Sequence, residues 1–305
     1  MSKTNLINRI LVPVQFNAEG EKLLLYAGQM ARAMQAELVL LYAAQVPDIT
    51  YTQQNRVIQA LRLFGERVLL RLPKMATDFV GFEGLVRPGN LQQNIRAVVQ
   101  ENAIDLVLME ACSLPASEAE WGNHAAGIME AISCPVMVVP PTARFVKPPN
   151  LVFATDFTDR DPQVLLRIAS FARQLQAHLT LVQVYTAEQR DQLCQMKADL
   201  RETHTILAGF EVSLKLLEEE DMLEGIGDFA EAKAADMLVL ATRDNYLLQR
   251  LFSVNYIKTR AYHTQVPLLT FRQLKLKPCS GCCTNCASKQ KAMQMENSLQ
   301  LVAMK

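Results

Sequence analysis

Residues 151–157 read LVFATDF, an apolar run that ends in a threonine, Asp156 and a phenylalanine. An apolar run without alternation is typical of a strand buried on both faces of a parallel sheet. Open α/β sheets bind ligands at the carboxyl ends of their strands, where Asp156 lies. The alternative is an acid that only begins a turn or caps the next helix, although Thr158, Asp159 and Asp161 are better placed for capping. Asp156 is therefore a candidate ligand-binding carboxylate.

A second stretch of the same shape, ILVPVQF at 10–16, has Gln15 where the first has its aspartate. A shift of 141 residues places these two stretches on each other and also places Leu24 on Leu165. Further along, NAIDLVLMEA at 102–111 resembles KAADMLVLAT at 233–242, and GFE occurs at 81–83 and again at 209–211. Shared spacing over this length indicates an internal repeat of one structural unit.

Each unit alternates short apolar runs with amphipathic segments, which predicts strands and helices in turn. In the first unit we expect strands near 9–14, 37–43, 79–86, 105–109 and 135–139. The predicted fold class is therefore α/β, with two tandem, doubly wound domains that each contain a five-stranded parallel sheet. We place domain 1 at 1–141, a proline-rich linker at 142–149, domain 2 at 150–272 and a cysteine-rich tail at 273–305.

The last strands of the two units, VMVV at 136–139 and LLTF at 268–271, are short and apolar. An unpaired apolar edge strand is an aggregation hazard. We therefore expect the two edges to face each other, so that the domains form an intramolecular pseudo-dimer.

Composition narrows the class of protein. Half of the 305 residues are hydrophobic, and 31 Lys and Arg balance 31 Asp and Glu. This balance gives no electrostatic reason to expect nucleic acid or an anionic membrane surface as a partner. Neither a signal peptide nor a long apolar span is evident, so we expect a cytoplasmic protein with reduced cysteines.

The chain resembles the universal stress protein family in its tandem form, over about residues 8–140 and 149–272. The resemblance rests on RILVPVQF and LVFATDF as first strands, on AIDLVLMEA and AADMLVLAT as fourth strands, and on GNHAAGIMEAISCPVMVV as a last helix and strand. It implies a nucleotide-binding-like fold and dimerisation through the last strand. Many members bind ATP with an aspartate after the first strand and a loop G-x2-G-x9-G-[ST] after the fourth.

Neither copy retains that phosphate loop. In the second unit, the three glycines and the final hydroxyl residue are replaced by Ala241, Asp244, Val254 and Asn255. In the first unit, the loop is one residue shorter and the same positions hold Glu110, Ser113, Gly122 and Asn123. Glycines let the backbone approach phosphates, and a carboxylate there repels them. We expect standard MgATP binding to be lost in both units.

The resemblance to the family implies a degenerate nucleotide pocket, made of the binding positions that remain. Its candidate residues are Asp156, Thr155, Ala154 and Val184 of the second unit and Gly122 and Asn123 of the first. Asp156 is then either a relic or part of a pocket for a smaller or different ligand.

The C-terminal tail contains two CxxC pairs in immediate succession, CSGCCTNC, with Cys279, Cys282, Cys283 and Cys286 as candidate metal ligands. Paired thiolates suit zinc or another soft metal, or a redox couple. Zinc ribbons separate their pairs by a dozen or more residues, so one tetrahedral site here would be strained. A site shared between chains, a redox pair and a simple tail of reactive thiols remain open.

The sequence favours a non-enzymatic protein that acts by binding in a stress response or in regulation. Its four histidines are far apart and form no repeated motif, which gives catalysis little support. One alternative is an adenine-nucleotide-binding protein or slow ATPase that uses Asp156, and another is a thiol or metal sensor that uses the tail. We expect no cofactor under the favoured interpretation, a protein partner or small ligand of unknown identity, and a pseudo-dimer that is able to pair further as a homodimer.

Overall fold

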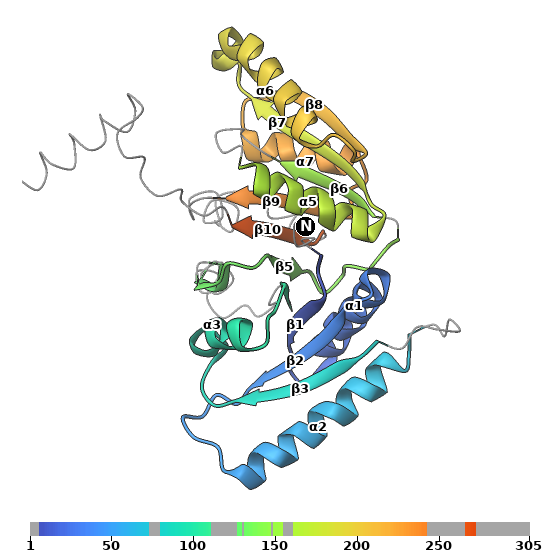
Figure 1. Cartoon of the computed structure of the whole chain (residues 1–305), viewed down its shortest axis with the longest axis vertical. Coiled ribbons are helices and arrows are strands. Elements are labelled where there is room, and N and C mark those ends of the chain that lie inside the picture. The colour runs from blue at the N-terminus through green and yellow to red at the C-terminus, as the bar shows by residue number, and fades with distance from the viewer. Residues whose placement is uncertain are drawn as a thin grey trace, which may run out of the picture. The chain divides into compact units, whose positions relative to one another are not determined.

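The repeat seen in the sequence is present in the structure as two domains of the same topology (Figure 1). The structure is a computed structural model that describes residues 6–72, 80–110, 127–129, 131–147, 149–154, 161–242 and 266–272. No helix in this described part of the chain has the length and apolar content needed to span a bilayer.

Domain 1 alternates strands and helices as the sequence predicts. Its elements are β1 (Arg9–Pro13), α1 (Ala18–Met34), β2 (Glu37–Ala43), α2 (Tyr51–Leu69), β3 (Phe82–Arg87), α3 (Leu91–Glu101), β4 (Leu106–Glu110) and β5 (Val136–Val139). Side-chain caps fix the helix starts: Asn17 accepts a hydrogen bond from the Gly20 amide, and Thr50 and Asn90 form capping boxes.

Domain 2 repeats this order with small changes. Its elements are β6 (Asn150–Ala154), α5 (Pro162–Leu175), β7 (His178–Tyr185), a 3₁₀ helix (Ala187–Gln192), α6 (Leu193–Ile206), β8 (Val212–Glu218), α7 (Met222–Ala232), β9 (Met237–Thr242) and β10 (Leu268–Arg272). The prediction that Asp161 is well placed as a cap is confirmed, because its side chain accepts from the Gln163 amide at the start of α5.

All strands join one ten-stranded sheet in the order β3-β2-β1-β4-β5-β10-β9-β6-β7-β8. Pairing is parallel within each domain, and the only antiparallel pair among the described strands is β5 with β10. Met137 lies opposite Leu269 at the centre of that pair, and Thr270 donates its hydroxyl hydrogen bond to the Val136 carbonyl at 3.1 Å. The expected pairing of the two last strands is confirmed.

Helices cover both faces of this sheet (Figure 1). The residues of α1, α2 and α5 share one hydrophobic core with one face of the strands, and this core runs through both domains. The opposite core includes residues of α3 and α7. Burial on both faces explains why inner strands such as β4 and β5 are apolar rather than alternating, whereas the edge strands β3 and β8 are only partly buried.

The repeated GFE triplet does not mark equivalent positions, so that part of the sequence correspondence is wrong. Leu38 pairs with Phe82, whereas Leu179, its counterpart in domain 2, pairs with Val212. The second triplet lies in the turn before β8, where Gly209 adopts a φ of 96°. Strand register, rather than the short shared triplet, decides which residues correspond.

One polar side chain of domain 2 holds backbone of domain 1. Gln174 on α5 donates from Nε2 to the Ile7 carbonyl at 2.8 Å and to the Met34 carbonyl at 2.9 Å. Its Oε1 accepts from the Ile7 amide at 2.9 Å. Both ends of the amide are therefore satisfied by the other domain, which supplements the strand pairing.

Candidate functional site

The carboxyl ends of the strands are the expected ligand edge of each domain. Of the predicted pocket residues, Ala154 ends β6 and Val184 lies near the end of β7, and both side chains are buried. The predicted positions Thr155, Asp156, Gly122 and Asn123 lie outside the described residues, as do Cys279, Cys282, Cys283 and Cys286 of the tail. Within the described ranges, no group of three or more His, Cys, Asp or Glu side chains is arranged to hold a metal ion.

In domain 1 the turn after β1 is closely packed against the start of α1. The Val14 amide donates to the Leu41 carbonyl at 2.9 Å, which ties the residue after β1 to β2. The exposed Gln15 side chain accepts from Nδ2 of Asn17 at 3.1 Å. A Cβ atom added to Gly20 would lie 2.1 Å from the Gln15 carbonyl oxygen, so only glycine permits this approach.

Two carboxylates meet at the end of β4. Glu110 occupies the first glycine position of the phosphate loop and lines a small cavity together with Glu19 and Lys22 of α1. The cavity measures only about 10 Å³, which is close to the minimum of about 10–15 Å³ that one water needs. This cavity is therefore far too small to hold a nucleotide.

The charge of this corner opposes an anionic ligand. Burial raises the pKa of the Glu110 carboxyl, the nearby Glu19 carboxylate raises it further, and Lys22 lowers it. A raised carboxyl pKa means that the negative form is already disfavoured by its surroundings. A triphosphate would add several more negative charges beside the same two groups.

Aromatic side chains occupy the space beside the first two strand ends in domain 1. The Phe16 ring stacks on Tyr42 with centroids 5.0 Å apart and meets Phe64 of α2 edge-on at 5.5 Å. The Arg67 guanidinium lies 5.5 Å from the centroid of the Phe64 ring. This cluster packs the β1–α1 turn against α2 and the end of β2.

In domain 2 the corresponding corner is built differently. Val184 contacts the start of α7, since a Cβ added to Gly225 would lie 3.1 Å from a Val184 methyl carbon. Gln183 takes the register position that Tyr42 has in domain 1. Its side chain is buried, and among the described residues no donor reaches its Oε1. The second domain thus keeps an amide where the first has an aromatic ring.

Sequence reasoning placed Glu110 in the degenerate loop but missed its neighbours on α1. Glu19 belongs to the first turn of a helix, where acids are common because they complement the helix dipole. Nothing in the spacing of Glu19 and Glu110 signals their meeting, because the two residues are 91 positions apart and only the intervening fold brings them together. The only sequence signal was the pairing of β1 with β4 that the fold class implies.

Comparison with solved structures shows the fold. The chain is similar to a universal stress protein from Archaeoglobus fulgidus DSM 4304, with 13% identity, a TM-score of 0.61, and coverage of 89% of this chain and 98% of that one. It is also similar to a functionally unknown protein from Pseudomonas aeruginosa PAO1, with 21% identity, a TM-score of 0.57, and coverage of 89% of this chain and 95% of that one. No curated protein matches the sequence.

The sequence profile of the universal stress protein family matches the chain twice, at residues 7–140 and 149–272. Each match contains one complete five-stranded half of the sheet. The chain belongs to the universal stress protein family, as a tandem pair of its domains.

Proposed function

We propose that this universal stress protein acts by binding a protein partner or small ligand, in a stress response or in regulation, and not by catalysis. In this proposal standard MgATP binding has been lost in both domains. The observation that supports it most directly is the meeting of Glu110 and Glu19 at the ligand edge of domain 1, in a cavity of about 10 Å³.

The physical reason is electrostatic. A triphosphate is bound by several backbone N–H groups that approach it closely, and these need glycines and a positive local field. Domain 1 instead presents a carboxylate at the first glycine position and a second one from α1. Lys22 offsets part of this charge but leaves the pair net negative.

For domain 2 the support comes from sequence. Ala241, Asp244, Val254 and Asn255 replace the four loop positions, so one carboxylate and one branched side chain stand where phosphates need backbone. Asp156 keeps the adenine-side acid without the loop that would hold the phosphates. We therefore propose that Asp156 is a relic or contacts a ligand other than MgATP.

The test is calorimetric titration of MgATP into the full chain and into Asp156→Ala, with Asp228→Ala as a matched control, since Asp228 is an exposed aspartate on α7 of the same domain. We expect no micromolar binding by any of the three. Micromolar binding by the parent and by Asp228→Ala that disappears in Asp156→Ala would overturn the proposal and establish the nucleotide alternative.

A gain-of-function variant makes the expected negative result informative. The combination Ala241→Gly, Asp244→Gly, Val254→Gly and Asn255→Ser restores the loop pattern in domain 2. We expect it to bind MgATP more tightly than the parent, because it restores close backbone approach and removes one carboxylate. No gain would show that the pocket differs from the family pattern beyond its loop.

Native mass spectrometry of freshly purified protein under reducing conditions separates the remaining alternatives. Retained nucleotide would favour the nucleotide-binding alternative. Bound zinc that is lost when Cys279, Cys282, Cys283 and Cys286 are replaced by serine would favour the sensor alternative. The same spectrum reports whether two tandem chains associate.

A further inference from the structure

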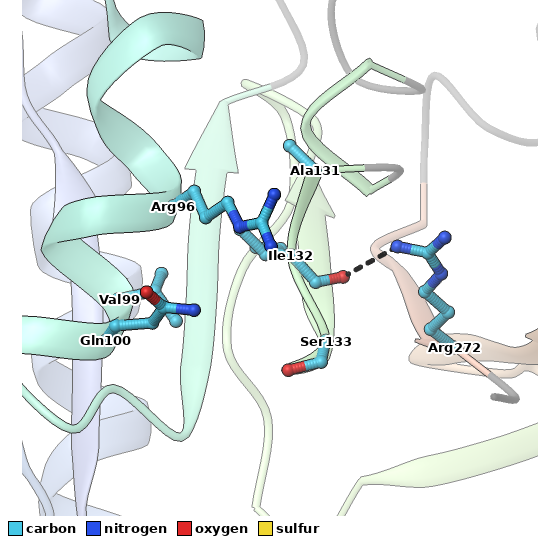
Figure 2. A pocket seen from close by; sticks show the side chains of 7 residues that line it. All are labelled: Arg96, Val99, Gln100, Ala131, Ile132, Ser133 and Arg272. Atoms are coloured by element: carbon cyan, nitrogen blue, oxygen red, sulfur yellow. Dashed lines mark hydrogen bonds between the residues drawn. The ribbon is translucent and has the colours of Figure 1, made fainter.

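A pocket at the junction of the two domains belongs to the contact between them (Figure 2). It is flanked by Arg96 of α3 and by Arg272 at the end of β10. Nη1 of Arg272 donates a hydrogen bond of 3.5 Å to the Ile132 carbonyl, which joins β10 to the segment before β5. This arginine therefore serves the packing of the two domains. The outward face of α2 has no such role and is the stronger candidate for a binding surface.

That face holds the three most exposed large apolar side chains in the described part of the chain. Tyr51 is 78% exposed, Leu63 66% and Leu70 70%, whereas no other large apolar side chain that the structure describes exceeds 47%. The helix lies at the outer edge of domain 1, beside the edge strand β3 (Figure 1). Apolar surface that is left in water at one place on a protein marks an interaction site.

The exposed side chains border an open groove of about 550 Å³ along the helix. Leu63 and Leu70 are two helical turns apart and so share one face. The groove itself is lined in part by Tyr51, Asn55, Arg56, Gln59 and Leu63. Its lining spans about three turns of the helix. A long, narrow surface of this kind fits an amphipathic helix of another protein.

The same helix is basic. α2 contains three arginines and one glutamate, Glu66. Arg67 is paired with Glu21 of α1. Among the described residues, neither Arg56 nor Arg62 has an ion-pair partner. The apolar side chains are thus accompanied by a net positive charge, in a chain whose overall charge is zero.

The repeat shows the equivalent helix without this surface. The two helices are aligned by their buried residues, which have the same spacing in both: Leu61, Phe64 and Val68 in α2, and Met196, Asp199 and Thr203 in α6. In this alignment Leu63 corresponds to Ala198, and Leu70 corresponds to Thr205.

The start of the helix and the charge differ in the same way. Tyr51 follows the N-cap of α2, whereas Ala187 follows the equivalent N-cap in domain 2. α6 has two Lys or Arg side chains and two Asp or Glu side chains, so its charges balance. The same fold is therefore built in domain 2 without exposed large apolar side chains and without net positive charge. Folding does not require either feature of α2.

The groove also discriminates between occupants. Asn55 and Gln59 carry amide groups that need hydrogen-bonding partners once they are covered, and a lipid bilayer supplies none. A second copy docked through the same patch about a two-fold axis would place Arg56 and Arg62 beside the same arginines of its partner. Like charges at that contact oppose self-association. A protein partner of opposite charge meets neither difficulty.

We propose that the outward face of α2 binds an amphipathic helix of a partner protein, whose apolar stripe is flanked by Asp or Glu. Tyr51, Leu63 and Leu70 pack against the stripe, and Arg56 and Arg62 pair with the flanking acids. This inference rests on the proposed binding function and deepens it, because it assigns the surface and the chemistry of the partner.

The experiment is fluorescence anisotropy with two labelled synthetic helical peptides of about 18 residues, or five turns. Both peptides carry one leucine stripe, flanked by glutamates in one and by lysines in the other. We expect the full chain to bind the glutamate peptide saturably and the lysine peptide at least about tenfold more weakly. Affinity for the glutamate peptide should fall as salt is added.

The test variants are Arg62→Glu and the double variant Leu63→Ala, Leu70→Ala. Each should weaken binding of the glutamate peptide by about tenfold or more, since one reverses a complementary charge and the other truncates the apolar anchors. The matched controls lie in domain 2 and should bind like the parent. They are Lys197→Glu, at the position equivalent to Arg62, and Leu166→Ala, an exposed leucine on α5.

Three results would overturn the proposal: no saturable binding of the glutamate peptide, equal binding of both peptides, or equal weakening by Lys197→Glu. Two more would assign the surface to another occupant. One is cosedimentation with vesicles of phosphatidylcholine and phosphatidylserine that the double variant loses, and the other is a dimer in sedimentation velocity that the double variant loses. The calorimetric titration of MgATP tests the proposed loss of nucleotide binding separately, so failure of one proposal is distinguishable from failure of the other.

Discussion

The helices α1 and α5 are equivalent, and both end with a glutamine in the left-handed conformation, at a φ of 56° for Gln35 and 57° for Gln176. Nine residues before these caps, domain 1 has Tyr26 and domain 2 has Arg167. Tyr26 meets the Phe145 ring edge-on, with centroids 5.6 Å apart, whereas the Arg167 guanidinium lies 5.6 Å from the centroid of the Phe271 ring.

The two positions also differ in charge. Burial raises the pKa of the Tyr26 phenol, and the negative charge of Asp236 raises it further, so the phenol is neutral. Burial lowers the pKa of Arg167, while Cys134 and Asp105 raise it. Burial also raises the pKa of the Cys134 thiol to about 12, which makes this cysteine an inert packing group rather than a reactive thiol.

This comparison shows that the halves have become different components of one molecule. Each domain retains the apolar residues that build the sheet, but the polar residues at the junction occur in only one copy. A homodimer of identical domains would place the same residues on both sides of its two-fold axis. A tandem chain is free of that constraint, so domain 2 can carry Arg167 where domain 1 has Tyr26.

The largest effect we expect comes from the shared core. Leu24 of α1 and Leu165 of α5 are equivalent and buried, and both belong to the core that runs through the two domains. Replacing either with alanine removes buried methyl groups and leaves a cavity, which costs about 2–5 kcal/mol of unfolding free energy. Because one core and one sheet join the domains, both variants should shift the same single transition in differential scanning calorimetry.

The control is Leu63→Ala on the exposed face of α2, which should change stability by less than about 0.5 kcal/mol. Separate transitions, one moved by Leu24→Ala and the other by Leu165→Ala, would show that the domains unfold independently. The comparison would then be between two autonomous domains rather than two halves of one cooperative unit.

An intermediate effect should follow from Gln174→Ala. When α1 and α5 are aligned on their C-caps Gln35 and Gln176, Gln174 of α5 corresponds to Ala33 of α1. Gln174→Ala therefore gives domain 2 the residue that domain 1 has at this position. It leaves the Ile7 amide and two carbonyl groups without their partner, which costs about 1–3 kcal/mol. Chemical denaturation measures the loss.

The reference for this variant is Gln163→Ala at the exposed start of α5, for which we expect almost no change in unfolding free energy. Equal, small effects of the two substitutions would mean that strand pairing alone holds the N-terminal segment. Faster amide exchange at Ile7 in Gln174→Ala would support the hydrogen bonds directly.

The smallest effect should come from Glu110→Gln, as a change in stability that depends on pH. Because the pKa of Glu110 is raised in the folded chain, the folded state holds this proton more tightly than the unfolded state. The parent therefore loses stability as pH rises from the ordinary carboxyl value through the raised folded pKa. Glutamine avoids that loss, so Glu110→Gln should be more stable than the parent at about pH 7 and not at about pH 4.

The gain should be less than about 1 kcal/mol, because solvent screens a half-exposed carboxyl. Thermal unfolding at the two pH values checks it, with Glu66→Gln on the exposed face of α2 as the reference. A variant that is less stable than the parent at neutral pH would show that Glu110 is held by favourable contacts, against the electrostatic argument for domain 1.

The sequence by itself determined the repeat, the α/β class and the pairing of the last strands. These depend on patterns that are local or periodic: apolar runs for strands buried on both faces, one apolar stripe for each helix, and an edge that must be covered. Residues such as Leu24 and Leu165 recur at equal spacing because the same packing problem recurs. The lost phosphate loop was also visible in sequence, since glycine positions are required by backbone geometry.

Only the tertiary structure decided which polar side chains meet. Glu110 lies beside Glu19, Gln174 holds Ile7, and Arg96 shares a pocket with Arg272, although each pair is far apart in the chain. For Glu110 and Arg272, which end β4 and β10, strand register decides which face of the sheet the side chain takes. Glu19, Gln174 and Arg96 lie on helices, so their places depend on how those helices pack on the sheet. Register in turn depends on the packing of both domains together, which no single stretch of sequence contains.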